Sequence, residues 1–202
     1  PGTCIPRAHQ ESLAATGDLL NKAGAMIRKA ASPAQDENQV TVINPTSFDR
    51  NDVIYLDYVP GMKVKGDYAQ QITETLEGGK KLAVAGVEIP AYGSVVLTLE
   101  HGEPDSRSPF GISGRDLVTP FAQVTFDERG FMKSFKDTEA DRELVGEGYP
   151  LNTFLVAEDL PSEWDNWDVD ADLQLKFKDC AQFKSSEVIS KGAVELRIRN
   201  KY

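Results

Sequence analysis

Short runs of β-branched and aromatic residues, separated by proline and glycine about every ten residues, limit the fold of this chain most strongly. Asn44-Pro45, Pro60-Gly61 and Gly78-Gly79 mark turns between these runs. The runs predict five strands, at residues 40–43, 53–59, 68–76, 81–89 and 94–99. Strands this short and this regularly spaced predict a small β-sandwich over residues 39–101.

A second β region follows a connection rich in glycine, proline and serine at residues 102–117. Its first hairpin is predicted between residues 123–126 and 131–136, with Gly130 at a turn position that favours positive φ. Further strands are predicted at residues 152–156 and 168–178, and a final hairpin is predicted between residues 182–190 and 193–199, around Lys191-Gly192. Two β regions joined by a turn-rich connection predict a mainly β protein.

One helix is predicted ahead of the β regions, over residues 7–31. Apolar side chains recur there at three- and four-residue spacing, and Leu13, Leu20 and Ile27 are among them. Residues 32–38 then form a polar linker. A single amphipathic helix cannot bury its own apolar face, so we expect this helix to pack against a partner outside the chain.

The charge of the chain argues against two classes of partner. Its 202 residues carry a formal net charge of −10, whereas nucleic acids and anionic membranes attract basic surfaces. No run approaches the ~20 apolar residues that cross a bilayer, and no signal peptide is visible. We therefore expect a cytoplasmic protein without nucleic-acid or membrane partners. Because the chain opens on Pro1 rather than methionine, we expect its true N-terminus to lie upstream.

Both tryptophans of the chain, Trp164 and Trp167, lie in the segment 152–172, NTFLVAEDLPSEWDNWDVDAD. Carboxylates surround them, at Asp159, Glu163, Asp165, Asp168, Asp170 and Asp172. An aromatic ring can stack on a pyranose while carboxylates accept hydrogen bonds from its hydroxyls. The segment is therefore a candidate sugar site. A loop with one core tryptophan and solvated acids explains the same composition.

The D-x-D-x-D series that begins at Asp168 resembles the opening of a calcium-binding loop. That loop requires glycine at its sixth position and favours glutamate at its twelfth, where this chain has Leu173 and Asp179. The alternation of polar and apolar residues over 168–178 instead predicts a strand with a solvated acidic face. Such a face does not raise a carboxyl pKa as a glycosidase acid requires, so a catalytic pair here is not expected.

Five segments, taken together, resemble the middle and C-terminal parts of family 38 glycoside hydrolases, the α-mannosidases, in their microbial form. In chain order they are PGTCIP at 1–6, VINPTSFDR at 42–50, IPAYG at 89–93, FDERG at 126–130 with the KD and REL that follow, and DNWDVD at 165–170. Each segment is short, but their order is kept across nearly the whole chain.

This resemblance implies a fold and an activity. It implies that residues 1–35 end a helical bundle, 39–101 form a small β-sandwich, and 118–202 begin a larger C-terminal sandwich. The parent would be a retaining α-mannosidase that hydrolyses terminal α-mannosyl linkages in α-mannoside oligosaccharides. In the family, a separate N-terminal catalytic domain carries the nucleophilic aspartate and a zinc ion held by two aspartates and two histidines. The resemblance places none of these groups on this chain, and His9 lies beyond the motif.

The chain is therefore expected to be non-catalytic, to hold no metal, and to act as a scaffold for that catalytic domain. Residues that could reach the rim of the active site are Asn152, Asp159, Trp164, Asp165, Trp167 and Asp168. Two alternatives remain open. The chain could be a carbohydrate-binding β-sandwich module with no hydrolase partner, or a purely structural unit in which Trp167 is buried.

Overall fold

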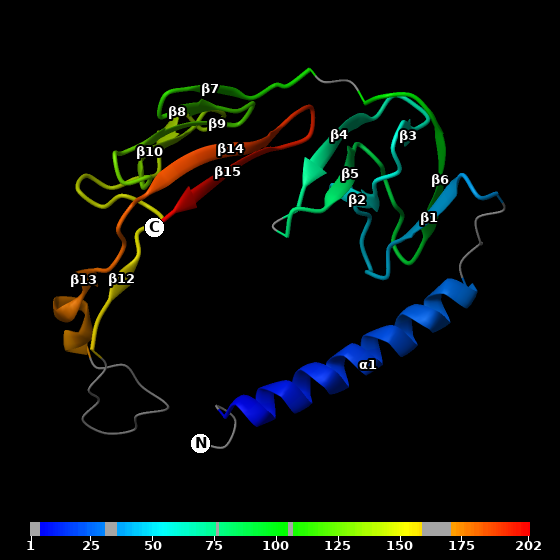
Figure 1. Cartoon of the computed structure of the whole chain (residues 1–202), viewed down its shortest axis with the longest axis horizontal. Coiled ribbons are helices and arrows are strands. Elements are labelled where there is room, and N and C mark those ends of the chain that lie inside the picture. Colours follow the sequence, from blue (N-terminus) through cyan, green and yellow to red (C-terminus); the bar gives the residue numbers. More distant parts are fainter. Residues whose placement is uncertain (1–4, 31–35, 76, 105–106, 159–170) are drawn as a thin grey trace. The chain divides into compact units, whose positions relative to one another are not determined.

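A computed structural model describes residues 5–30, 36–75, 77–104, 107–158 and 171–202 (Figure 1). The chain divides into two compact units, Pro1–Asp105 and Ser106–Tyr202. Antiparallel sheets dominate both units, which confirms the mainly β class. No helix in the described ranges has the length and apolarity that a membrane span requires.

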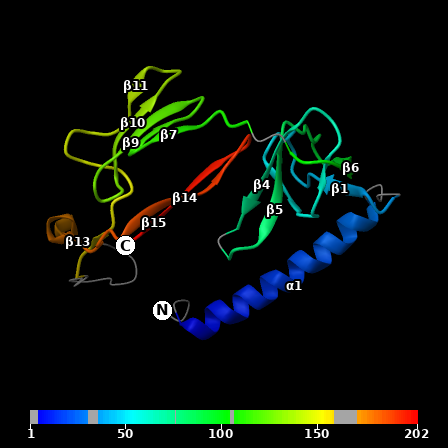
Figure 2. The same cartoon turned by 45° about the horizontal axis from the view of Figure 1, so that its top comes forward.

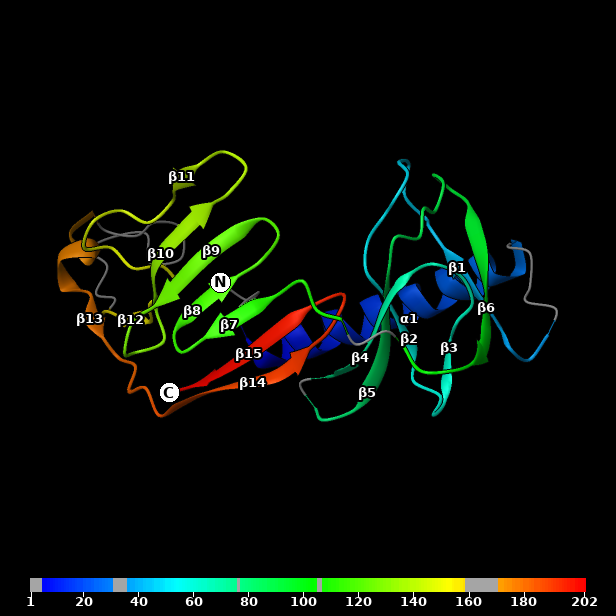
Figure 3. The same cartoon turned by 90° about the horizontal axis from the view of Figure 1, so that it is seen from above.

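The first unit contains two three-stranded antiparallel sheets (Figure 3). One sheet has the strand order β1-β6-β3 and the other β2-β5-β4. The strands are β1 (Gln39–Ile43), β2 (Ile54–Asp57), β3 (Met62–Val64), β4 (Ala69–Glu74), β5 (Lys80–Ala85) and β6 (Ser94–His101). Each of the five strands predicted in this region is present, although β5 ends at Ala85 rather than at residue 89. The short strand β3 was not predicted.

The core of the first unit draws on both of its sheets. Its buried side chains are Leu56, Val64, Leu82, Val84, Val87, Ile89 and Leu97. In β1, β2, β5 and β6 the residues that pack in or against this core alternate along the strand, as the period of two residues in a strand requires. Gln70 of β4 is buried beside it and makes two 2.7 Å hydrogen bonds, one to the backbone N–H and one to the carbonyl of Val64. These bonds satisfy the backbone of β3, which pairs with β6 on its other side.

The predicted helix forms as α1 (Pro6–Ala30). None of its side chains is buried, and the apolar residues Leu13, Leu20 and Met26 are exposed. Ion pairs at i,i+4 spacing join Arg7 to Glu11 and Lys22 to Asp18 along its surface.

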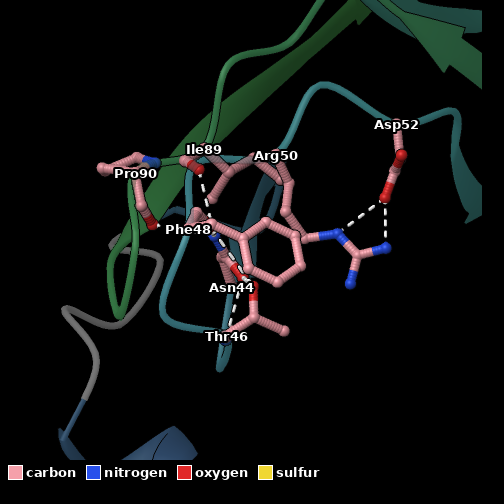
Figure 4. A network of polar contacts seen from close by, with 7 residues as sticks. All are labelled: Asn44, Thr46, Phe48, Arg50, Asp52, Ile89 and Pro90. Atoms are coloured by element: carbon pink, nitrogen blue, oxygen red, sulfur yellow. Dashed lines mark hydrogen bonds and ion pairs between the residues drawn. The ribbon is translucent and has the colours of Figure 1, made fainter.

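Asn44 is a buried polar residue of the first unit, and its side chain makes several hydrogen bonds (Figure 4). Its side-chain amide nitrogen donates to the carbonyls of Phe48 (2.7 Å), Ile89 (3.1 Å) and Pro90 (3.1 Å). Its side-chain oxygen accepts from the backbone N–H of Thr46 at 3.0 Å and from the hydroxyl of Thr46 at 2.6 Å. One side chain therefore satisfies polar groups on two turns that lie about 45 residues apart.

We name residues 44–50 and 89–93 the Asn44 turn pair. Backbone hydrogen bonds also join the two turns: Asn44 N–H to Gly93 O, Tyr92 N–H to Thr46 O, and a reciprocal pair between Arg50 and Ile89. The carboxylate of Asp49 accepts from the N–H of Ala91 at 2.8 Å. The VINPTSFDR and IPAYG segments are thus two halves of one hydrogen-bonded structure.

The second unit is built on a five-stranded antiparallel sheet of order β11-β10-β9-β8-β7 (Figure 2). Its strands are β7 (Gly111–Ser113), β8 (Asp116–Val118), β9 (Ala122–Phe126), β10 (Met132–Asp137) and β11 (Arg142–Glu143). Two strand pairs complete the unit: β12 (Leu155–Val156) with β13 (Lys178–Asp179), and β14 (Ser185–Lys191) with β15 (Leu196–Lys201).

The two predicted hairpins of this unit are confirmed as β9–β10 and β14–β15. The prediction of a strand over residues 168–178 is wrong. Residues Ala171–Lys176 form the 3₁₀ helix η2, in which Lys176 pairs with Asp172 at 2.9 Å. The predicted strand 152–156 is reduced to the two residues of β12. The predicted connection at 102–117 contains β7 and the start of β8, whose short length gave no clear alternation in the sequence.

The carboxylate of Glu143 in β11 is bonded to β10 and to the residue that follows Leu144. Glu143 accepts from the Ser134 hydroxyl at 2.6 Å and from the N–H groups of Phe135 (2.8 Å) and Val145 (2.9 Å). The hydrogen bond from Ser134, followed by those from the backbone of Val145 and Phe135, lowers the pKa of Glu143 from 4.5 to about 2. The REL segment thus supplies an ionised carboxylate that is bonded within its own sheet.

We predict that Asn44→Asp destabilises the protein by about 3 kcal/mol, because three carbonyls each lose one of their hydrogen-bond donors and face a carboxylate instead. The matched control is Asn38→Asp at an exposed position, where only one hydrogen bond, to Leu99 O, is lost; it should cost less than about 1 kcal/mol. Urea unfolding followed by circular dichroism measures both. Equal losses in the two variants would show that the Asn44 turn pair does not depend on this amide.

We predict that Glu143→Gln is less stable than the unmodified protein at neutral pH, and that this difference shrinks in acid. A carboxyl with a lowered pKa stabilises the fold above its unfolded pKa near 4.5, and this contribution is lost as the pH falls to about 2. Melting temperatures measured across this range test the prediction. The control is Glu139→Gln, which removes an exposed charge from the turn between β10 and β11. Its difference in melting temperature from the unmodified protein should not shrink as the pH falls.

Candidate functional site

In the chain, the segment with both tryptophans lies between two paired strands of the second unit. β12 and β13 are antiparallel, with Leu155 opposite Asp179 and Val156 opposite Lys178. Cys180 extends this pairing, since its N–H donates to Phe154 O at 3.3 Å. The pairing brings together residues more than 20 positions apart, and residues 157–177 connect the two strands in the chain. We call this segment the tryptophan loop.

Of the predicted rim residues, the structure describes Asn152. It is exposed and has a φ of 61°, a left-handed conformation that asparagine tolerates better than most residues. It directly follows Leu151, which is bridged to Met132 of β10. The others, Asp159, Trp164, Asp165, Trp167 and Asp168, lie outside the described residues, so their role at an active-site rim stays a prediction.

Side-chain hydrogen bonds hold the turn between β9 and β10 and join it to Asn200 and Tyr202. One carboxylate oxygen of Asp127 accepts from the N–H groups of Arg129 and Phe131, both at 2.9 Å. Gly130 has a φ of 76°, which confirms the predicted glycine conformation. Its carbonyl accepts from the side chains of Asn200 (3.2 Å) and Tyr202 (3.3 Å). The FDERG turn is therefore fastened to the end of the chain.

Four aromatic side chains pack beside this turn. The ring of Phe131 is buried and lies 5.7 Å from the ring of Tyr202 in a stacked arrangement. Phe154, which precedes β12, meets Tyr202 edge to face at 4.9 Å, and Phe183 does so at 5.9 Å. Tilted and stacked pairs at these separations are favourable aromatic contacts. The cluster joins the entry of the tryptophan loop to the hairpin and to the C-terminal residue.

An ion pair fixes the other end of the loop. The guanidinium of Arg129 pairs with the carboxylate of Asp179 in β13, and it also lies 4.7 Å from the centre of the Phe131 ring. Both partners are partly exposed, so we assign the pair a positioning effect rather than a large stabilising one. The two strands that bracket the loop are thus held by Phe154 on one side and Asp179 on the other.

A shallow groove lies at the base of the loop. It has a volume of about 460 Å³ and is lined by Val156, Ala157, Glu158, Lys176 and Lys178. Its side chains offer one carboxylate and two ammonium groups as hydrogen-bonding partners. Two leucines next to lining residues in the sequence are exposed to solvent: Leu155 has an exposed fraction of 53% and Leu175 one of 88%. Within the described ranges, no three His, Cys, Asp or Glu side chains gather closely enough to hold a metal ion.

Comparison with known proteins identifies the second unit. Residues 117–202 match the family described as the glycosyl hydrolases family 38 C-terminal domain. This match supports the resemblance to glycosyl hydrolase family 38 that the segments of the chain indicated. No curated protein matched the chain.

Sequence reasoning did not find several residues that hold the candidate site. Arg129, Asp179 and Tyr202 act through contacts between segments 50 or more positions apart, and no local pattern marks them. Asp127 and Gly130 could be found, because an aspartate three positions before a glycine is typical of a hairpin turn.

We predict that Gly130→Ala destabilises the second unit by about 2–3 kcal/mol. An added Cβ would lie 2.9 Å from the Phe183 ring and 3.2 Å from the Asn200 amide nitrogen. Gly114→Ala is the matched control, since Gly114 also has a positive φ, of 59°, but no atom within 4 Å of the added carbon. The control should cost only about 1 kcal/mol. Thermal melting compares the two, and equal losses would remove the contact from the explanation.

Proposed function

We propose that the chain is a non-catalytic part of a retaining α-mannosidase that hydrolyses terminal α-mannosyl linkages. The observation that supports this most is the family 38 match over residues 117–202. In this proposal the partner is an N-terminal catalytic domain, which supplies the zinc ion and the nucleophile. The described residues do not form a zinc site, so no chemical step is assigned to a metal on this chain.

The role proposed for the second unit is to present the tryptophan loop. The loop begins and ends at β12 and β13, and these strands are fixed by the aromatic cluster and by the Arg129–Asp179 pair. A site that must hold a ligand needs such support from outside its own residues. Trp164, Trp167 and the neighbouring carboxylates would then meet α-mannoside oligosaccharides at the rim of the catalytic domain.

Two measurements on the full chain test this role. The chain alone, with zinc added, should not hydrolyse 4-nitrophenyl α-mannoside faster than buffer does. Because Trp164 and Trp167 are the only tryptophans, tryptophan emission reports on the loop alone. Titration with methyl α-mannoside should leave this emission unchanged, since the scaffold lacks the rest of the site.

Two results would contradict the proposal. Hydrolysis that persists after purification would place catalytic groups on the chain itself. A saturable change in emission that is lost in Trp167→Ala but kept in Phe121→Ala would instead support an independent carbohydrate-binding module. Phe121 is a suitable control because its ring is 74% exposed and lies outside the loop.

A further inference from the structure

The helix α1 presents an apolar face that the described residues do not bury. None of its side chains is buried, and Leu13 and Leu20 are 73% and 68% exposed. The large apolar side chains of α1 gather on one half of the helix surface, while its charged side chains lie on the other half. Such a helix gains most of its stability by packing its apolar face, so this face is suited to a partner.

The apolar face carries a repeat of large and small residues. The large residues recur every seven positions, at Leu13, Leu20 and Ile27. A smaller residue follows each of them three positions later, at Thr16, Ala23 and Ala30. This is the spacing of the two core positions in a pair of packed helices. The partner that such a face fits is therefore another helix.

The sizes of these side chains suit an antiparallel second copy of α1. With the two-fold axis level with the midpoint of residues 20–23, Leu20 of one copy shares a layer with Ala23 of the other, and Leu13 shares a layer with Ala30. Two-fold symmetry repeats each contact, so every layer combines one large and one small side chain. In a parallel pair each residue would meet its own copy, and Ala23 against Ala23 would leave a gap.

The charges of α1 favour the same orientation. Both of its acidic residues, Glu11 and Asp18, precede the midpoint, whereas three of its four basic residues follow it, at Lys22, Arg28 and Lys29. An antiparallel pair brings the basic end of one helix beside the half of the other that contains the acids, and a parallel pair would bring the two basic ends together. The helix dipoles also oppose each other in the antiparallel pair.

We propose that α1 is a self-association surface, through which two copies of the chain form an antiparallel helix pair centred on residues 20–23. The apolar face of each α1 is then covered by the α1 of the second copy. Leu13, Leu20 and Ile27 of one copy pack beside the small residues of the other, which let the two helix axes approach closely. The surface lies on α1 alone and does not depend on the function proposed for the chain.

Sedimentation equilibrium of the full chain tests this proposal. The mass of the unmodified chain should rise reversibly with concentration from 22.2 kDa to twice that value. Leu20→Glu should abolish the dimer, because it places a charge in a central layer of the helix pair. Ala25→Glu adds the same charge at an exposed position on the charged side of α1 and should leave the dimer unchanged. Circular dichroism checks that both variants keep the helix.

A size exchange within one layer tests the register. Leu20→Ala opens a gap beside Ala23 of the second copy, and Ala23→Leu crowds Leu20 of that copy. Each change should weaken the dimer about tenfold or more, because the two-fold symmetry repeats it. The double variant Leu20→Ala/Ala23→Leu again combines one large and one small side chain in the layer, so it should recover most of the lost affinity.

Three results would overturn the proposal. A chain that stays at 22.2 kDa up to millimolar concentration does not pair through α1, which leaves the apolar face to helices of another domain. A dimer that survives Leu20→Glu forms through a different surface. Tighter association in Ala23→Leu than in the unmodified chain would show a parallel pair or an unspecific apolar contact, and either one contradicts the antiparallel register.

Discussion

The carboxamide of Asn44 is the contact on which the closure of the first unit depends. Its donors and acceptor serve two turns that are remote in sequence, one leading out of β1 and the other leading into β6. Each of the three carbonyls also accepts from a second donor, from Thr46 at Phe48, from Arg50 at Ile89 and from Gly93 at Pro90. The Asn44 amide therefore adds a further hydrogen bond to each carbonyl and joins the two turns through one side chain.

The second unit uses side chains on backbone groups in the same manner. Asp127 holds the β9–β10 turn and Asp137 holds the β10–β11 turn, each by accepting from backbone N–H groups. Glu143 joins β11 to β10 in the same way. The buried apolar side chains described in this unit are Ala122, Val124 and Phe131. The aromatic cluster around Tyr202 extends this order to the strands that bracket the tryptophan loop.

The sequence by itself determined the helix predicted at 7–31, the five short strands predicted in the first unit, the hairpin at Gly130 and the resemblance of the second unit to family 38. These features follow local rules of periodicity and turn chemistry, which act over a few residues. Only the tertiary structure decided that residues 171–176 form a 3₁₀ helix despite their strand-like alternation, and that Asp179 meets Arg129. It also decided that Asn44 bonds to both turns. Such contacts depend on which segments closure of the chain brings together, and no local pattern encodes that choice.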